Sequence, residues 1–497
     1  MKTYTTKLKD GVRWPLVLLA GLSLFVNAVT AASKAPNFLF IIGEGQGWSS
    51  LSVPMDDRWP NSKSDLQLTP NLDRIAKEGM RFANFYAPSP RCTPSRAAYF
   101  TGVSPAQLHM TFVNEGKGDA VAAGTKVIPA KTTTEMSQGV TTVAELLKRA
   151  GYATAHFGKW HVGRTNPSQH GYDENDGPNS NDGPDHVANP NPKQAYATAE
   201  LGMNFMERQV KAGKPFYLQV AHYAGKSALD AKPETYDAVL KRAGGRDKAR
   251  VGAAAVAEDA DITVGMLLKK LDQLGIADNT YVIYTTDHGA QGRRANEPLN
   301  NGKGTIWDGG LRVPLLIRGP GIKAGVFARQ RTSGVDLLPT IAELSGNKEP
   351  LSAQVEGGSL VPILKNAGQG EVKRAREEFV VHFPHYDKDL VGPATAIYLG
   401  DLKLVRIYET GERRLYDVAK DIAEKNDLAK QQPDKVAALD QRLTDYLKAV
   451  KAEMPSLNPK PDPNVKVTEL PGDRRGGKGK DGKKKGKDTE QPKPNKL

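Results

Sequence analysis

Short apolar runs of β-forming residues alternate with helix signals along most of this chain. The runs are NFLFII (37–42), YATAHF (152–157), PFYLQVAHY (215–223), TYVIYTTD (280–287) and VPLLIRGPG (313–321). The helix signals are TPNLDRIAKEG (69–79), TTVAELLKRAG (141–151) and AAAVAEDADITVGMLLKKLDQLG (253–275). Such alternation is typical of α/β folds, and parallel strands buried on both faces are continuously apolar. We therefore predict a large, mostly parallel sheet flanked by helices.

Capping residues define the ends of the predicted helices. Thr69 stands as N-cap before Pro70, and Thr142 and Glu145 have the spacing of a capping box. After about residue 370 the pattern changes to short strands followed by a helix at about 433–450, which predicts a small antiparallel sheet with one helix. The predicted organisation is a signal peptide (1–32), an α/β domain (33–370), a small C-terminal α+β subdomain (371–455) and a disordered basic tail (456–497).

The N-terminus has the features of an export signal. Four basic residues precede an apolar stretch of about 16 residues, and small residues near Ala31 and Ala32 suit cleavage. This stretch is shorter than the roughly 20 residues of a membrane span, so we expect no stable membrane insertion. We expect an exported protein, either periplasmic or secreted.

The net charge of +13 lies mostly at the two ends of the chain. Residues 471–497 carry a net +6 and residues 1–32 a net +3, which leaves +4 for residues 33–470. A mildly basic folded body does not indicate nucleic-acid binding. The Gly/Lys/Pro-rich tail predicts a solvated, disordered segment, and a tether to an extracellular polyanion is the alternative.

Three places along the chain carry residues suited to chemistry. Glu44 follows the first predicted strand and Asp287-His288 follows the strand at 280–287. Ligands of open α/β sheets bind beyond the carboxyl ends of such strands. Cys92 is the single cysteine and has no internal disulfide partner. It lies in PSPRCTPSRAAYFTG (88–102), where a turn with a nearby arginine is a poor environment for an inert thiol.

Five segments in order resemble the formylglycine-dependent sulfatase family, a branch of the alkaline-phosphatase superfamily. They are CTPSR (92–96), GYATAHFGKWHVG (151–163), TTDHG (285–289), NGKGTIWDGGLRVP (301–314) and LYDVAKDIAEKNDLA (415–429). The resemblance covers roughly residues 35–450 and implies a sulfatase-like fold. It also implies hydrolysis of sulfate esters, most naturally those of a sulfated small molecule or polysaccharide.

The resemblance assigns Cys92 a role that explains its isolation. In the family, a formylglycine-generating enzyme or an anaerobic sulfatase-maturing enzyme oxidises this cysteine to formylglycine. One hydroxyl of the aldehyde hydrate attacks the sulfur of the ester, and the other later expels sulfate. Cys92 is thus expected to be a precursor of the nucleophile.

The resemblance also implies a divalent metal, with Ca²⁺ expected and Mg²⁺, Mn²⁺ or Zn²⁺ as alternatives. The ligands would be Glu44, Asp287, His288 and residue 92. One family ligand is missing, because the family has ADDQG where this chain has GEGQG, so that Gly45 replaces the second acid. The nitrogen of His288 suits transition metals better than calcium.

Further site residues are implied by the same matches. Lys159 and Lys303 would bind the sulfate oxygens, His161 would act on the formylglycine hydroxyl, and Arg96 would brace the formylglycine. Lys159 and His161, two apart, would point to one side of an extended segment.

The general acid for the leaving group is left open. In the family a histidine often stands at the position of Lys226 and acts on the leaving-group oxygen. Lys226 and His222 are therefore the candidates for the general acid, and both are also assigned to sulfate binding. His382 and His385 would lie near the substrate rim or in a surface hairpin.

Two other functions remain possible at this level. One is a phosphate or phosphonate ester hydrolase of the same superfamily, because His288 and Gly45 depart from the sulfatase pattern. The other is a catalytically impaired protein that binds sulfated glycans, although the intact CTPSR argues against it. The sugar, the sulfated position and endo or exo action depend on loops such as 113–138 and 164–200.

Overall fold

The computed structural model describes residues 1–3, 35–113, 124–181, 194–223, 230–246, 248–465 and 467. Residues 4–32 of the predicted signal peptide, Lys226 and the basic tail beyond residue 467 lie outside the described residues. The elements described below all belong to the compact unit Ala35–Leu497. None of the described helices is long and apolar enough to cross a membrane.

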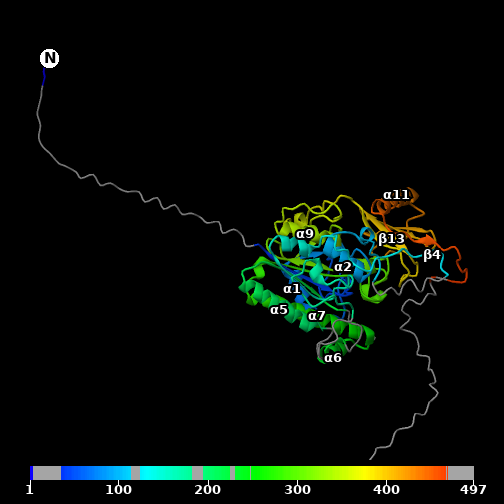
Figure 1. The fold of residues 1–497 in the computed structure, drawn as a ribbon, viewed down its shortest axis with the longest axis horizontal. Coiled ribbons are helices and arrows are strands. Elements are labelled where there is room, and N and C mark those ends of the chain that lie inside the picture. Colours follow the sequence, from blue (N-terminus) through cyan, green and yellow to red (C-terminus); the bar gives the residue numbers. More distant parts are fainter. Residues whose placement is uncertain are drawn as a thin grey trace, which may run out of the picture. The chain divides into compact units, whose positions relative to one another are not determined.

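An eight-stranded sheet forms the centre of the fold (Figure 1), in the order β10-β2-β9-β8-β1-β7-β5-β6. The bounds are β1 Asn37–Gly43, β2 Met80–Phe82, β5 Ala153–Gly158, β6 Glu174–Asn175, β7 Phe216–Ala221, β8 Thr280–Thr286, β9 Leu315–Arg318 and β10 Val326–Ala328. All neighbouring strands pair in parallel except β9, which runs antiparallel to both β8 and β2. The predicted mostly parallel sheet is confirmed.

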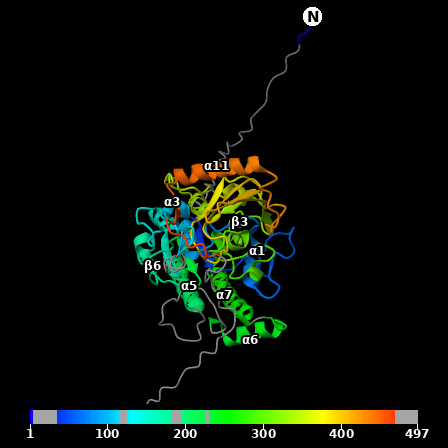
Figure 2. The ribbon, with the colours of Figure 1, turned by 90° about the vertical axis from the view of Figure 1, so that its right-hand side faces the viewer.

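Helices cover both faces of this sheet (Figures 1 and 2). Their bounds are α1 Pro70–Glu78, α2 Cys92–Thr101, α4 Val143–Arg149, α5 Ala195–Lys211, α7 Lys248–Gln273 and α9 Leu337–Leu344. Phe38 and Phe40 of β1 belong to the core shared with α2, α4 and α9, whereas Leu39 and Ile41 belong to the core shared with α1, α5 and α7. Alternating β1 residues therefore enter opposite cores, which explains why the strand is apolar throughout.

The C-terminal residues form the predicted antiparallel sheet and helix. The strands are β12 Phe379–Phe383, β13 Ala394–Leu399, β14 Leu402–Ile407 and β15 Arg413–Asp417, and the helix is α11 Pro433–Ala449. One sheet face packs on α11 through Leu404 and Leu443, and the other packs on Tyr86 and Trp307. Division of the chain at residues 370/371 stays a prediction.

Smaller elements complete the described part. They are β3 Phe85–Tyr86, α3 Pro105–Leu108, β4 Val127–Ile128, α6 Pro233–Arg242, α8 Asp308–Leu311, β11 Thr332–Ser333, α10 Val361–Lys365 and β16 Ser456–Leu457. A buried ion network ties α8 to the C-terminal sheet, because Lys403 contacts Asp308 and Glu424 at 2.9 and 2.6 Å.

The two predicted helix caps had different outcomes. The capping box of Thr142 and Glu145 at the start of α4 is confirmed. Thr69 occupies the N-cap position of α1, but its side chain makes no capping bond. Asp261 of α7 accepts from Asn71 N and Leu72 N at 3.1 and 2.8 Å, so it caps α1 from a distant part of the chain.

Candidate active site

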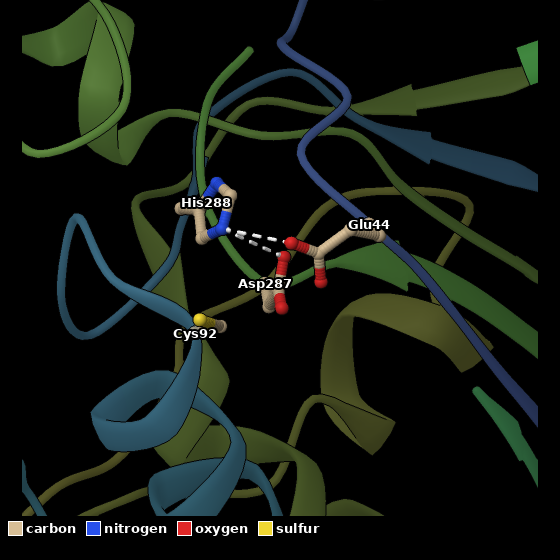
Figure 3. A group of neighbouring side chains, drawn as sticks. All are labelled: Glu44, Cys92, Asp287 and His288. Carbon is tan, nitrogen blue, oxygen red and sulfur yellow. Dashed lines mark ion pairs between the residues drawn. The ribbon is translucent and has the colours of Figure 1, made fainter. Parts of the chain in front are cut away.

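Parallel pairing brings the two predicted acidic clusters together. Gly43 and Thr286 end the adjacent strands β1 and β8 in register, so Glu44 and Asp287 come next, side by side, at the carboxyl edge of the sheet. Cys92 begins helix α2 below them. Figure 3 shows Glu44, Asp287 and His288 converging, with Cys92 beside them. Their ligand atoms all lie within 4.8 Å of one another.

The donor set of this cluster fits a divalent cation. Two carboxylates face an imidazole nitrogen, since His288 Nε2 lies 3.5 Å from Glu44 Oε1 and 3.3 Å from Asp287 Oδ1. His288 Nδ1 lies 2.9 Å from the Gly289 carbonyl oxygen and so carries a proton that it donates there. Nε2 is buried and makes no hydrogen bond within the described part of the chain. A buried ring nitrogen that faces two carboxylates is typical of a metal-ligating histidine. In such histidines the hydrogen bond of the other ring nitrogen, here Nδ1, fixes the tautomer.

The absent second acid at Gly45 has a steric explanation. Gly45 has a φ of +58°, and a Cβ built there would lie 3.1 Å from His288 Cε1. The His288 ring therefore occupies the space beside this position, and the left-handed backbone favours glycine. Gly45 N donates to Asp287 Oδ1 at 3.2 Å, so its backbone still supports the cluster.

Arg96 lies one helical turn after Cys92 and connects the two acidic residues. Residues four apart share one helix face, which explains the spacing in CTPSR. Arg96 donates to Asp287 Oδ2 at 2.9 Å, to Glu44 Oε2 at 3.1 Å and to the Lys159 carbonyl at 2.6 Å. Its side chain is fully buried, so these partners offset the cost of burying its charge.

Two lysines complete a shell of positive charge. Lys159 follows β5 and its Nζ lies 2.7 Å from Glu44 Oε2, while Lys303 Nζ lies 3.4 Å from Glu44 Oε1. Burial alone raises the pKa of Glu44, but Lys159 and Lys303 hold that pKa well below its usual range. Glu44 therefore remains ionised at neutral pH.

The Cys92 thiol lies in the same electrostatic environment. Burial raises the pKa of Cys92, but Lys159 and His161 lower it well below the usual thiol value. His161 interacts with the Cys92 thiol. The segment that carries it is not extended, because His161 has a φ of +58°. Trp160 N and His161 N both donate to the Asn179 carbonyl, at 2.9 and 3.0 Å, which holds this uncommon conformation in place.

His222 is not suited to the role of general acid. Thr263 Oγ1 donates to the Ala260 carbonyl at 2.8 Å and therefore accepts from His222 Nε2 at 3.0 Å. Burial lowers the pKa of His222 to about 4, so the ring is neutral at neutral pH and has its proton directed at α7. The other candidate, Lys226, lies outside the described residues.

The histidines of 381–386 have separate positions. His382 lies in β12 and bonds Thr395 Oγ1 and the Glu453 carbonyl at 2.7 and 2.9 Å, which indicates a structural role. His385 follows β12 and contacts Thr111 Oγ1 at 2.8 Å. Both side chains are buried, so neither forms part of an exposed hairpin.

One pair beside the cluster was missed from the sequence. Arg91, the N-cap residue of α2, forms an ion pair with Asp387 from the segment after β12. The only sequence signal was the position of Arg91 directly before Cys92, and nothing local marks Asp387.

Comparison with known proteins identifies the family of this chain. The model of the family described as Sulfatase matches residues 36–347, and that described as N-sulphoglucosamine sulphohydrolase, C-terminal, matches residues 301–453. The chain is 34% identical over 391 residues to N-acetylgalactosamine-6-sulfatase of Sus scrofa, covering 71% of this chain and 70% of that protein. It is 27% identical to a sulfatase of Formosa agariphila, covering 81% and 86%.

Solved structures share the fold. The structure of Ps i-CgsB in complex with k-i-k-neocarrahexaose has a TM-score of 0.69 at 22% identity, covering 83% of this chain and 93% of that one. BT4656 in complex with D-glucosamine-2-N,6-O-disulfate has a TM-score of 0.62 at 21% identity, covering 87% and 100%. With more than half of the chain matched by the family model and five motif segments in the family's order, the chain belongs to the sulfatase family.

Proposed function

We propose that this protein is a sulfuric ester hydrolase that removes sulfate from a carbohydrate, with Cys92 converted to formylglycine. The observation that carries this proposal is the convergence of Cys92, two acidic residues and His288 with Arg96 and two lysines at one edge of the sheet. Relatives named N-acetylgalactosamine-6-sulfatase support a carbohydrate substrate, as do fold neighbours described in complex with k-i-k-neocarrahexaose or D-glucosamine-2-N,6-O-disulfate.

Each residue is proposed to act according to its position. A divalent cation held by Glu44, Asp287, His288 and residue 92 would supply positive charge beside the nucleophile and the sulfate. Calcium remains our expectation from the resemblance, and the nitrogen of His288 makes Mn²⁺ and Zn²⁺ its competitors. Arg96 would orient both carboxylates through the hydrogen bonds that it donates to them.

The remaining polar groups serve the substrate and the proton. Lys159 and Lys303 would neutralise the sulfate oxygens, which a fixed cation does without reorganisation. His161, next to residue 92, would take the proton from the attacking hydroxyl. Hydrolysis consumes one water and yields the free alcohol and sulfate, and Lys226 stays a candidate for protonating the alcohol oxygen.

The proposed location is outside the cytoplasm. The basic and apolar N-terminal segment of residues 1–32 supports export. A periplasmic or secreted sulfatase would meet sulfated polysaccharides directly. Its proposed partner, before export or during it, is a maturation enzyme that oxidises Cys92.

The test combines mass spectrometry with turnover. The chain is produced with a formylglycine-generating enzyme, and the tryptic peptide of residues 92–96 is weighed. We expect an aldehyde at residue 92 and turnover of sulfated sugars from a panel that also contains 4-nitrophenyl sulfate and an aryl phosphate diester.

Two variants sharpen the result. Cys92→Ala should fold, as circular dichroism can show, and should release no sulfate. Cys92→Ser retains a hydroxyl but cannot expel sulfate from a geminal diol, so it should release at most one alcohol per enzyme molecule. An unmodified thiol in fully active enzyme would refute the proposal, as would a clear preference for the phosphate diester.

A further inference from the structure

The ion pair of Arg91 and Asp387 lies directly beside the catalytic cluster and has no part in the mechanism above. Arg91 Nε and Nη2 donate to the two carboxylate oxygens of Asp387, which is the two-point fork of a strong guanidinium–carboxylate pair. Arg91 precedes Cys92 in the chain, whereas Asp387 comes from the C-terminal sheet, between β12 and β13.

The pair adjoins the proposed sulfate-binding lysine. Gly304 follows Lys303, and a Cβ built on Gly304 would lie 2.4 Å from Asp387 Oδ2. Gly304 N also donates to the Pro90 carbonyl at 3.0 Å. The backbone beside Lys303 therefore contacts Asp387 and the residue before Arg91, which fixes the pair next to the sulfate position.

The segment that carries Asp387 is held firmly. Asp389, two residues later, accepts from Ile306 N at 3.0 Å and from Trp307 Nε1 at 3.3 Å. The Arg91 guanidinium lies 5.9 Å from the centre of the Phe112 ring. Such support preorganises polar groups and lowers the entropy lost on binding.

Exposure indicates where the substrate enters. The side chains of Arg96 and Lys159 are 0% exposed, whereas those of Lys303, Arg91 and Asp387 are 15%, 15% and 9% exposed. Among these described residues, the exposure of the side chain to solvent thus increases from Arg96 and Lys159 toward Lys303 and the ion pair. The alcohol part of a bound sulfate ester would extend toward solvent, and this gradient of exposure points to the side of the site that holds Arg91 and Asp387.

We propose that Arg91 and Asp387 are the specificity-determining residues that bind hydroxyl groups of the sugar carrying the reacting sulfate. A guanidinium has more N–H donors than the two that Asp387 engages, and a carboxylate oxygen can accept more than one hydrogen bond. Neighbouring sugar hydroxyls donate and accept together and match this pair, whereas an aryl ring offers neither. This inference rests on the proposed function and extends it to the leaving group.

The experiment compares two substrate classes on two variants. Asp387→Asn keeps the shape but loses the charge, and Arg91→Lys keeps the charge but loses the fork. The substrates are the sulfated monosaccharide that the wild type cleaves fastest and 4-nitrophenyl sulfate. We expect kcat/KM for the sugar to fall about 10- to 100-fold, mainly through KM, and that for the aryl sulfate to change less than about threefold.

Three controls separate specificity from damage. Rates are normalised to the aldehyde content of the 92–96 peptide, since Arg91 adjoins the modified residue, and unfolding temperatures are compared. The matched control is Asp272→Asn, which breaks the exposed fork between Arg74 and Asp272 across α1 and α7 and should alter neither substrate. Equal losses on both substrates, or no loss on either, overturn this inference. A wild type that cleaves no sulfated sugar instead overturns the proposed function.

Discussion

Restoring the missing acid at residue 45 tests whether Gly45 and His288 are sterically matched. In Gly45→Asp, the left-handed backbone costs about 1–3 kcal/mol for a residue with a side chain. The Cβ would also lie 3.1 Å from His288 Cε1, and overpacking of this kind costs about 1–3 kcal/mol. We expect the single variant to lose roughly 2–6 kcal/mol of unfolding free energy in metal-free buffer.

The double variant Gly45→Asp/His288→Asn removes the imidazole that causes the contact. The steric part of the cost should be recovered, whereas the backbone part should remain. A double-mutant cycle is therefore expected to show a favourable coupling free energy of about 1–3 kcal/mol between the two positions. Urea unfolding followed by circular dichroism measures each corner of the cycle.

Metal binding to the same four proteins gives an independent readout. The double variant has three carboxylates and an amide oxygen in place of two carboxylates and a nitrogen, a set that suits Ca²⁺. Calorimetric titration after chelator treatment should show Ca²⁺ binding at least about tenfold tighter than in the wild type, which corresponds to about 1.4 kcal/mol. If the two substitutions add within about 0.5 kcal/mol and Ca²⁺ affinity does not rise, the steric argument is wrong.

Two further predictions concern stability. Burial raises the pKa of Asp176 to about 7, so its protonated form stabilises the fold at low pH and this contribution is lost as pH rises through 7. Asp176→Asn can still accept a hydrogen bond from Gly158 N. Its free energy of unfolding should therefore rise relative to that of the wild type as pH increases from 5 to 8. A difference in the free energy of urea unfolding that does not change with pH would contradict this. Lys403→Met should cost about 3–5 kcal/mol because it leaves two buried carboxylates unpaired, whereas Lys420→Met at an exposed site should cost almost nothing by thermal unfolding.

Local sequence patterns predicted the parts of the fold that depend on local physics. The apolar runs at 37–42 and 280–287 became β1 and β8, because buried parallel strands need no long-range information to be recognised. The capping box at Thr142 was likewise readable, since all its partners lie within three residues. The expected gathering of Glu44 and Asp287 followed from strand ends alone.

The helix at Cys92 was not predicted, and the reason is its burial. The CTPSR segment (92–96) was interpreted as a turn with a nearby arginine. In the structure, all ten residues of α2 are buried, so no amphipathic pattern marks the helix. Pro94 is tolerated because it lies in the first turn, where its missing N–H has no helical partner.

Contacts between distant residues account for the rest of the structure that the sequence did not reveal. Asp261 caps a helix 190 residues away, and Arg91 pairs with Asp387 across 296 residues. Neither pair has a local pattern, because only the tertiary fold brings the partners together. The fit of Gly45 against His288 is of the same kind, and a single sequence shows only that an acid is missing.

The charges around the cluster are consistent with the proposed function despite one acid fewer. Two carboxyl groups, those of Glu44 and Asp287, face three cationic side chains, those of Arg96, Lys159 and Lys303. Buried charges are stable only when paired, and the two cations that are fully buried are those with the shortest bonds to the carboxylates. Lys303 makes the longer contact and is the cation left partly exposed at the entrance. A sulfate group that arrives at Lys303 would therefore meet a cationic side chain, and with one acid fewer in the cluster the anion that the site is proposed to cleave would be repelled less.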